Sequence, residues 1–101
     1  MAALISFTGV LILQALAQGY KFGFDIMQVT SLPSGTIYPA LRRLESLDLV
    51  TSDWEKDLTA RKEGRPRRRY YSLTPAGRRH LKESEARVQA VGRLLPSRRT
   101  T

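Results

Sequence analysis

The chain has no cysteine and a single histidine, His80, and each shortage excludes a class of chemistry. Without cysteine the protein has neither a disulfide framework nor a thiolate nucleophile. One histidine cannot build a multi-histidine metal site. The sequence also contains no P-loop, no nucleophile elbow and no pair of acidic residues in an apolar setting. We therefore expect neither an enzyme nor a cofactor.

A hydrophobic run long enough to cross a bilayer is missing as well. The most apolar stretch, residues 1–16, is too short for a span. It lacks a basic start and is interrupted by Gln14, which argues against a signal peptide. We expect a buried helix there, and the length of 101 residues predicts a single domain.

Acidic residues are scarce where basic residues gather. The chain has 17 lysines and arginines against 9 acidic residues, a formal charge of +8. Eight of the basic residues lie between Arg61 and Arg79, where Glu63 is the only acid. The first 41 residues contain only two charged residues, Lys21 and Asp25. This surplus favours a polyanionic partner, either nucleic acid or an anionic membrane face.

Three helices are expected in the N-terminal half, over residues 4–18, 20–30 and 34–47. The first is apolar nearly all round, which predicts burial on several sides, with part of it supplied by a second subunit. The second ends before Pro33, because the residue that precedes a proline avoids helical dihedral angles. The third has Ser34 as its expected N-cap, and Asp48 at its end is expected in the left-handed conformation.

Two strands are expected next, over residues 50–58 and 67–73, joined by a polar loop at 59–66. A last helix begins with Thr74 as N-cap and Pro75 at the first helical position, and it ends at Pro96. The predicted fold class is therefore mainly α with a β-hairpin. Its order, helix-helix-helix-strand-strand-helix, is the winged helix-turn-helix arrangement.

The third helix is the first candidate for a contact with DNA. In a helix-turn-helix the second helix of the pair enters the major groove with its N-terminal residues. Hydroxyls and free backbone N–H groups at a helix start suit phosphate oxygens, and an arginine one turn later suits guanine or phosphate. An ordinary surface helix with a serine cap is the alternative. The predicted contacts are Ser34, Gly35, Thr36, Tyr38, Pro39 and Arg42.

The second candidate is the arginine-rich loop at residues 64–69. Arginine forks bind phosphates bidentately, and a flexible loop can follow a groove. A solvated run of charge is the usual alternative, but its position between two strands, after a helix-turn-helix candidate, favours DNA. We predict that Arg65, Arg67 and Arg68 contact DNA. Arg69 ranks below them because it belongs to the strand and is expected to be partly buried.

Four further residues carry structural expectations. Tyr71 and Leu73 are expected to anchor the hairpin to the helices. Trp54 is either a packing residue of the hairpin or the floor of a small-molecule pocket, and packing is favoured. His80 lies among basic residues and is expected on the surface of the last helix.

The last helix carries a narrow apolar stripe with a spacing of seven residues, which is typical of packing against a partner helix. The predicted homodimer contacts are Leu4, Phe7, Leu81, Val88, Val91 and Leu95. We therefore divide the chain into a winged helix-turn-helix DNA-binding domain at 1–74, a dimerisation helix at 75–96 and a disordered basic tail at 97–101.

Two separated motifs resemble the PadR-like family of transcriptional regulators. Residues 35–41 (GTIYPAL), followed by RLE at 43–45 and LV at 49–50, are similar to its recognition helix. Residues 64–66 (GRP), with RYYSLTPAG at 69–77, are similar to its wing and the entry to its last helix. Asp48 stands where the family usually has glycine. The chain lacks the larger C-terminal helical domain of long members, so it resembles the short form.

The resemblance implies a homodimeric repressor that binds a palindromic operator in double-stranded DNA, with dimer contacts from the last and first helices. It also implies release from DNA by a small aromatic effector. The lack of cysteine fits a cytosolic protein, and we expect a location in the cytoplasm at the nucleoid. Two alternatives stay open: a small-molecule-sensing module with secondary DNA binding, and a basic RNA-binding domain. A membrane partner is not expected.

Overall fold

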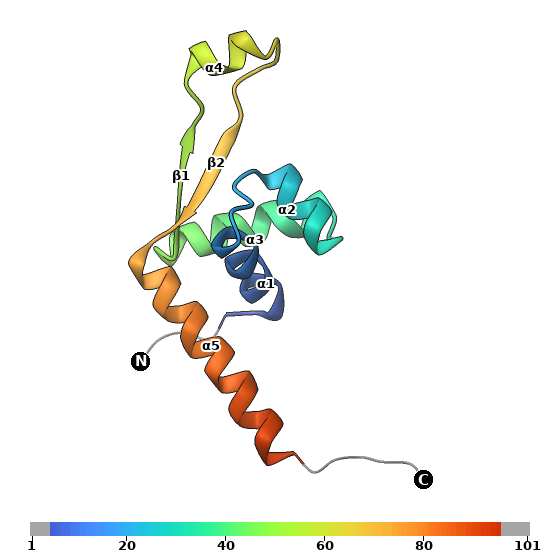
Figure 1. Ribbon diagram of the computed structural model, residues 1–101, viewed down its shortest axis with the longest axis vertical. Coiled ribbons are helices and arrows are strands. Elements are labelled where there is room, and N and C mark those ends of the chain that lie inside the picture. The colour runs from blue at the N-terminus through green and yellow to red at the C-terminus, as the bar shows by residue number, and fades with distance from the viewer. Residues whose placement is uncertain (1–4, 96–101) are drawn as a thin grey trace.

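The computed structural model describes residues 5–95, and its elements follow the expected order with one addition. The three N-terminal helices are α1 (Phe7–Ala17), α2 (Gly23–Thr30) and α3 (Ser34–Ser46). The antiparallel strands β1 (Val50–Trp54) and β2 (Arg69–Leu73) flank a short helix, α4 (Asp57–Lys62), and α5 (Pro75–Leu94) closes the fold. The hairpin projects from one end of the helical body and the second half of α5 from the other (Figure 1). No described helix has the length and apolarity that a membrane span requires.

The first two helices begin later than their apolar patterns predict. The Ser6 hydroxyl accepts a hydrogen bond from the Gly9 N–H at 3.1 Å, which sets the start of α1. Helix α2 begins at Gly23 rather than at residue 20, because the preceding residues extend the sheet. Phe22 forms an isolated bridge to Tyr70, and the Lys21 carbonyl accepts the Tyr71 N–H at 2.9 Å.

The end of α3 confirms the expected conformation of Asp48, while its start differs. Asp48 has a φ of 60°, and the N–H groups of Asp48 and Leu49 donate to the carbonyls of Glu45 and Leu44. This pairing is the Schellman motif, in which a left-handed residue satisfies the last helical carbonyls. At the start, Ser34 is the first helical residue and Pro33 holds the cap position, so the predicted serine cap is wrong.

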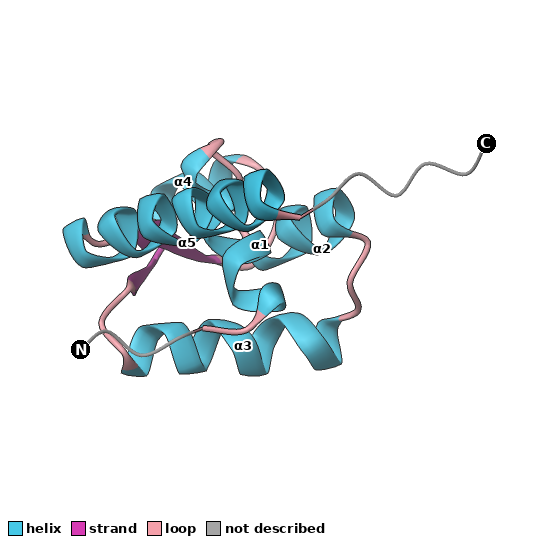
Figure 2. Cartoon of the chain, turned by 90° about the horizontal axis from the view of Figure 1, so that it is seen from below, coloured by secondary structure: helices cyan, strands magenta, loops and turns pink. Residues whose placement is uncertain are grey.

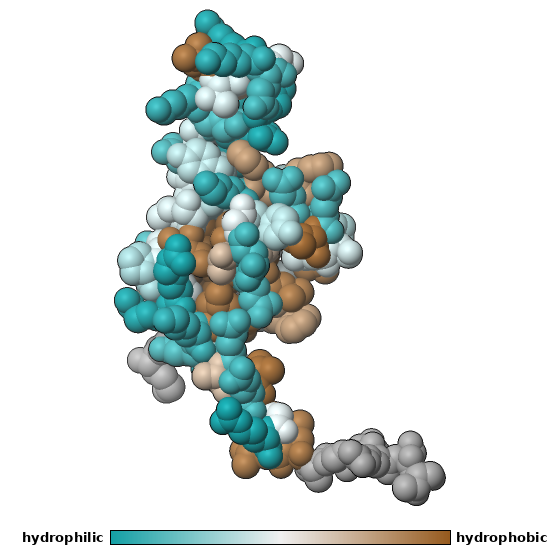
Figure 3. Space-filling view, in the orientation of Figure 1, coloured by the Kyte–Doolittle hydropathy of each residue, from teal (hydrophilic) through white to brown (hydrophobic). Residues whose placement is uncertain are grey.

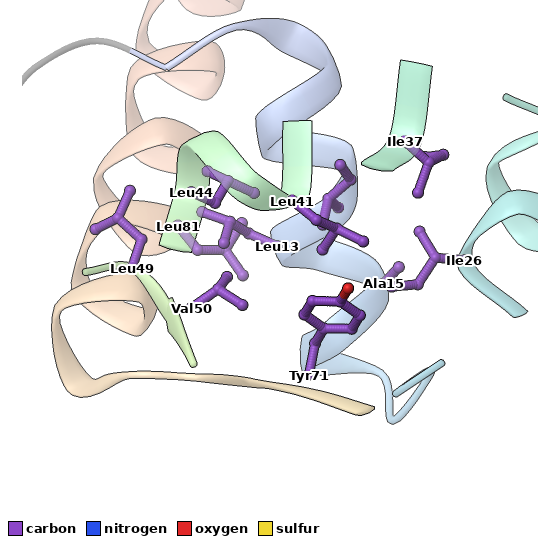
Figure 4. Close-up of a cluster of buried hydrophobic side chains, with 11 residues drawn as sticks. Leu13, Ala15, Ile26, Ile37, Leu41, Leu44, Leu49, Val50, Tyr71 and Leu81 are labelled. Carbon is purple, nitrogen blue, oxygen red and sulfur yellow. The ribbon is translucent and has the colours of Figure 1, made fainter. Parts of the chain in front are cut away.

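A single hydrophobic core joins α1, α2, α3, both strands and the first half of α5 (Figure 4). Tyr71 is buried in it and Leu73 packs against it, as expected of the hairpin anchors. The most buried side chains are Ile12, Leu13, Ile26, Ile37, Leu41, Leu44 and Val50.

Helix α5 passes through two environments, which overturns two expectations. Its first half packs along α1 (Figure 2), so that Leu81 is 7% exposed inside the core and His80 is 8% exposed. Leu81 is therefore a core residue rather than a dimer contact, and His80 is not a surface residue. The seven-residue spacing gave a wrong prediction for Leu81 because the same spacing continues from the buried half of the helix into the exposed half.

The tip of the hairpin is a helix and not the predicted polar loop. The strands pair in register from Val50 opposite Leu73 to Trp54 opposite Arg69, so both are shorter than expected. Helix α4 then forms between them, with Arg61 and Asp57 paired at 3.0 Å one turn apart. Gly64, with a φ of 65°, ends it in another Schellman motif. A short helix whose ends are fixed by local bonds has little apolar periodicity to reveal it.

The stability of the fold is expected to depend on Gly77. A Cβ atom at this position would lie 2.0 Å from the Leu49 carbonyl oxygen, a backbone atom. Gly77→Ala should therefore lower the free energy of unfolding by about 3 kcal/mol, as overpacked core substitutions do. Gly92→Ala is the matched control on the same helix, since nothing lies within 4 Å of its Cβ position. Urea unfolding measures both; equal midpoints for the two variants would contradict the close approach.

Candidate nucleic-acid interface

The start of α3 presents most of the predicted contact residues to solvent. Its buried side consists of Ile37, Leu41 and Leu44, which leaves Tyr38, Pro39 and Arg42 on the outer side. Ser34 and Gly35 are also exposed, and Thr36 is half-buried. Helix α3 lies along one side of the molecule, with its outer side uncovered (Figure 2). The predicted recognition residues therefore share one accessible helix end.

Tyr38 has a structural contact that the sequence did not reveal. A Cβ atom at Gly23 would come 2.6 Å from the Tyr38 hydroxyl oxygen. The tyrosine ring therefore lies directly over the first residue of α2, and only glycine leaves room for it. The side chain still keeps 38% of its surface exposed. Tyr38 thus fixes the angle between the two helices while its outer edge remains accessible.

A groove of about 350 Å³ separates the start of α3 from the hairpin. Trp54 lines it and is 51% exposed, so the favoured expectation of a packing residue is wrong, while the alternative of a small-molecule pocket stays a prediction. Strand β1 ends at Trp54, where the hairpin already extends beyond the helices that would cover the ring. The residues that line this aromatic groove are Phe22, Gly23, Phe24, Tyr38, Trp54, Arg68, Arg69 and Tyr71.

The hairpin beyond the strands, residues 55–68, is organised by one buried acid, Glu55. Its carboxylate accepts hydrogen bonds from the two terminal nitrogens of Arg65 at 2.5 and 2.9 Å. It also accepts the backbone N–H of Arg68 at 2.8 Å and the Arg68 Nε at 3.3 Å. The Glu55 carbonyl accepts the Arg67 Nε at 2.7 Å. We call residues 55–68 the wing.

These bonds keep Glu55 charged. The hydrogen bonds from Arg65 are the largest cause that lowers the pKa of the carboxyl from 4.5 to about 2, and burial opposes them. Glu55 in turn holds the pKa of the Arg65 guanidinium above its usual range. Because the folded pKa is depressed, the contribution of this pair is complete above pH 4.5 and is lost as the pH falls through about 2.

The wing arginines therefore differ in their surroundings, although the sequence analysis predicted the same role for all three. Arg65 is paired with Glu55 and Glu63, and its side chain is only 23% exposed. The Arg68 guanidinium lies 3.8 Å from the centre of the Phe22 ring. In residues 5–95, the two terminal nitrogens of Arg67 have no partner, and the side chain is exposed. Among the described residues, Arg67 and Arg68 both keep their terminal nitrogens without a hydrogen-bond partner. Arg68 rests on the Phe22 ring and its Nε is bonded to the Glu55 carboxylate, whereas the Arg67 guanidinium has neither a ring nor a carboxylate against it.

Arg69 lies on the strand, as expected, and is tied to neighbouring polar groups. Its Nη2 donates to the Ser52 hydroxyl at 2.6 Å and to Glu45 at 3.4 Å. The ion pair links the hairpin to α3. Arg69 keeps 46% of its side chain exposed, so it is partly buried, as expected.

Glu55 is the functional candidate that the sequence reasoning missed. A signal was available, because the strand register, continued by one residue past the Trp54–Arg69 pair, places Glu55 opposite Arg68. The bond from the Glu55 N–H to the Arg68 carbonyl, at 2.8 Å, has this register. Among the described residues no group of histidine, aspartate or glutamate side chains could hold a metal ion.

The exposed half of α5 carries the remaining predicted dimer contacts. Val88 is 70% exposed, and Val91 and Leu95 are also exposed, together with Leu94. They form apolar patches on the part of α5 that projects from the body (Figure 3). Phe7 on α1 is exposed too, whereas Leu4 and the tail at 97–101 lie outside the described residues.

Comparison with known proteins identifies the relatives of this architecture. A crystallised PadR family transcription regulator from Clostridium difficile R20291 has a TM-score of 0.77 and 26% identity, over 88% of this chain and 94% of that one. A PadR-like transcription factor from Bacteroides fragilis has a TM-score of 0.72 and 28% identity, over 85% and 84%.

A PadR family transcriptional regulator from Eggerthella lenta has a TM-score of 0.64 and 30% identity, over 89% of this chain and 85% of that one. No curated protein sequence matches the chain significantly. The family model described as "Transcriptional regulator PadR-like family" matches residues 12–83, which run from the middle of α1 through α2, α3 and the wing to the first half of α5. The chain therefore belongs to the PadR-like family of transcriptional regulators, as its two sequence motifs predicted.

Proposed function

We propose that this DNA-binding transcriptional regulator is a repressor that binds a palindromic operator as a homodimer. One observation supports this most directly: the exposed start of α3 and the basic wing face each other across one groove, which Tyr38, Arg68 and Arg69 line together. A recognition helix and a wing so placed can contact one stretch of duplex at the same time. Such a protein would work in the cytoplasm, at the nucleoid.

In this proposal the two elements have separate tasks. The start of α3, with Ser34, Gly35, Thr36, Tyr38 and Pro39, enters the major groove, and Arg42 extends the contact along the helix. Backbone N–H groups and hydroxyls there bind phosphates, while side chains that reach the base edges select the sequence. The wing adds phosphate contacts through Arg67, which supply affinity regardless of sequence.

The dimer is proposed to form through the exposed half of α5. Val88, Val91 and Leu95 lie on one side of that helix, and Leu94 borders them. Exposed apolar side chains in such a row are typical of an interface rather than of a free surface. A two-fold pair of chains presents two α3 helices in opposite senses, which is why the operator should be palindromic.

The DNA contact is tested with Arg67→Ala. We expect about tenfold weaker binding to operator and to random duplex alike, because a charged hydrogen bond to phosphate is lost. The slope of log affinity against log salt should fall by about 1. Arg78→Ala, an equal loss of charge at the exposed start of α5, should leave the slope nearly unchanged. A footprint on the DNA upstream of the coding sequence supplies the operator.

An unchanged slope for Arg67→Ala would contradict the assignment of the wing. Tighter binding to RNA than to any duplex would instead support the basic RNA-binding alternative.

The dimer is tested with Val88→Asp, which places a charge at the first residue of the apolar row. We expect monomers in sedimentation, since an unpaired carboxylate in a buried interface is strongly unfavourable. Gln89→Asp is the matched control, because it adds the same charge to an exposed neighbouring position that points away from the apolar row. It should remain dimeric. A persistent Val88→Asp dimer would place the interface elsewhere.

A second proposal is that a small aromatic effector with an anionic group releases the protein from DNA. The aromatic groove supports it, because five aromatic side chains line about 350 Å³ beside Arg69. Trp54 is the only tryptophan of the chain and reports on the groove directly. A ligand from a panel of aromatic acids should change its fluorescence saturably and weaken operator binding over the same concentration range. Release from DNA with unaltered Trp54 emission would exclude this groove as the effector site.

A further inference from the structure

A basic element that binds DNA gains nothing electrostatically from an acid at its centre, yet the wing is built around one. Glu55 is 8% exposed, in contrast to Asp57, the acid on α4, which stays at the surface. Phosphates repel a carboxylate, so the presence of Glu55 must be explained by what it holds in place. Each of its bonds goes to the segment 65–68 that carries the wing arginines.

The carboxylate closes the hairpin beyond the last strand pair. One oxygen accepts the Arg68 N–H at 2.8 Å, and the Glu55 N–H donates to the Arg68 carbonyl at 2.8 Å. The other oxygen accepts the Arg65 Nη2 at 2.9 Å, and Arg65 is held in turn by Glu63 at 2.9 Å. Both ends of the turn that contains Pro66 are thereby fixed to the end of β1.

Arg67 lies between these two fixed residues. Its Nε donates to the Glu55 carbonyl at 2.7 Å, which directs the guanidinium while its two terminal nitrogens stay accessible. A side chain that is ordered before binding loses less conformational entropy when it meets a phosphate. The network thus prepares a bidentate donor at the surface of the wing.

We infer that Glu55 is a positioning residue for DNA binding, which holds the wing so that Arg67 is presented to the phosphate backbone. This inference rests on the proposed function of the wing. Glu55 itself does not touch DNA. Its effect is indirect, through Arg65, Arg67 and Arg68.

The test contrasts two acids of the same wing. Glu55→Gln and Asp57→Asn change the formal charge identically, and by charge alone both should strengthen binding to DNA. Asp57 has an exposed side chain whose ion partner is Arg61 at 3.0 Å, so its removal leaves the network intact. We expect Asp57→Asn to bind DNA as tightly as the wild type or more tightly, and Glu55→Gln to bind roughly tenfold more weakly.

The salt dependence separates positioning from a general loss of affinity. Loss of the Arg67 contact should lower the slope for Glu55→Gln by about 1, whereas the slope for Asp57→Asn should not fall. Amide hydrogen exchange gives an independent reading, because the Arg68 N–H should exchange faster in Glu55→Gln while the Tyr71 N–H, bonded to Lys21, stays protected.

A second variant covers the case in which Glu55→Gln does not fold. Arg65→Gln removes the main partner of Glu55 but keeps the bond from the Arg68 N–H, and it should lower affinity and slope in the same direction. Equal affinity of the two acid variants, or an unchanged Arg68 exchange rate, would overturn the inference while wild-type DNA binding persists. Wild type without salt-dependent DNA binding would overturn the proposed function and the inference together.

Discussion

One junction fixes the directions of α3, the hairpin and α5 relative to one another. At the base of the hairpin the Thr74 hydroxyl donates to the Asp48 carbonyl at 2.7 Å and accepts the Gly77 N–H at 2.9 Å. The Thr74 N–H donates to the Leu49 carbonyl, against which Gly77 packs without a side chain. The end of α3, the start of β1, the end of β2 and the start of α5 therefore meet at a few backbone groups, and each satisfies another. The orientation of the wing relative to α3 depends on this contact.

The sheet connects the wing to the helices a second time. Phe22 forms an isolated bridge with Tyr70 of β2, the Lys21 carbonyl accepts the Tyr71 N–H, and the Phe22 ring supports the Arg68 guanidinium. The walls of the aromatic groove come from α2, α3 and the hairpin. The hairpin is joined to the segment before α2 by these contacts. A wing attached only through a two-stranded ribbon would bend easily, because an isolated hairpin has marginal stability. Here the paired strands continue into bonds with the helical body at one end and with Glu55 at the other.

Local signals in the sequence were sufficient where a residue acts on its own neighbours. Short-range patterns predicted three features correctly: Asp48 in the left-handed turn, Thr74 with Pro75 at the start of α5, and Tyr71 in the core.

The wrong predictions share a different cause. Leu81 repeats in step with Val88, but α1 covers only the first of them, and no periodicity records where a neighbouring helix ends. Arg65 looks like its neighbours in the sequence until Glu55, ten residues earlier, is brought opposite by the hairpin. Contacts across the fold decided these cases.

The shortness of the connections at the junction has a mechanical consequence. Only residues 47–49 join α3 to β1, and Leu73 reaches Pro75 through Thr74 alone. Because Thr74 is bonded to Asp48, Leu49 and Gly77, a rotation of α5 would be passed on to the hairpin and to α3. In a two-fold pair joined through α5, the crossing angle of the two helices would then set the distance between the paired α3 helices. That distance corresponds to one turn of B-DNA, about 34 Å, in helix-turn-helix dimers. A change in that crossing angle would therefore move the two α3 helices relative to each other.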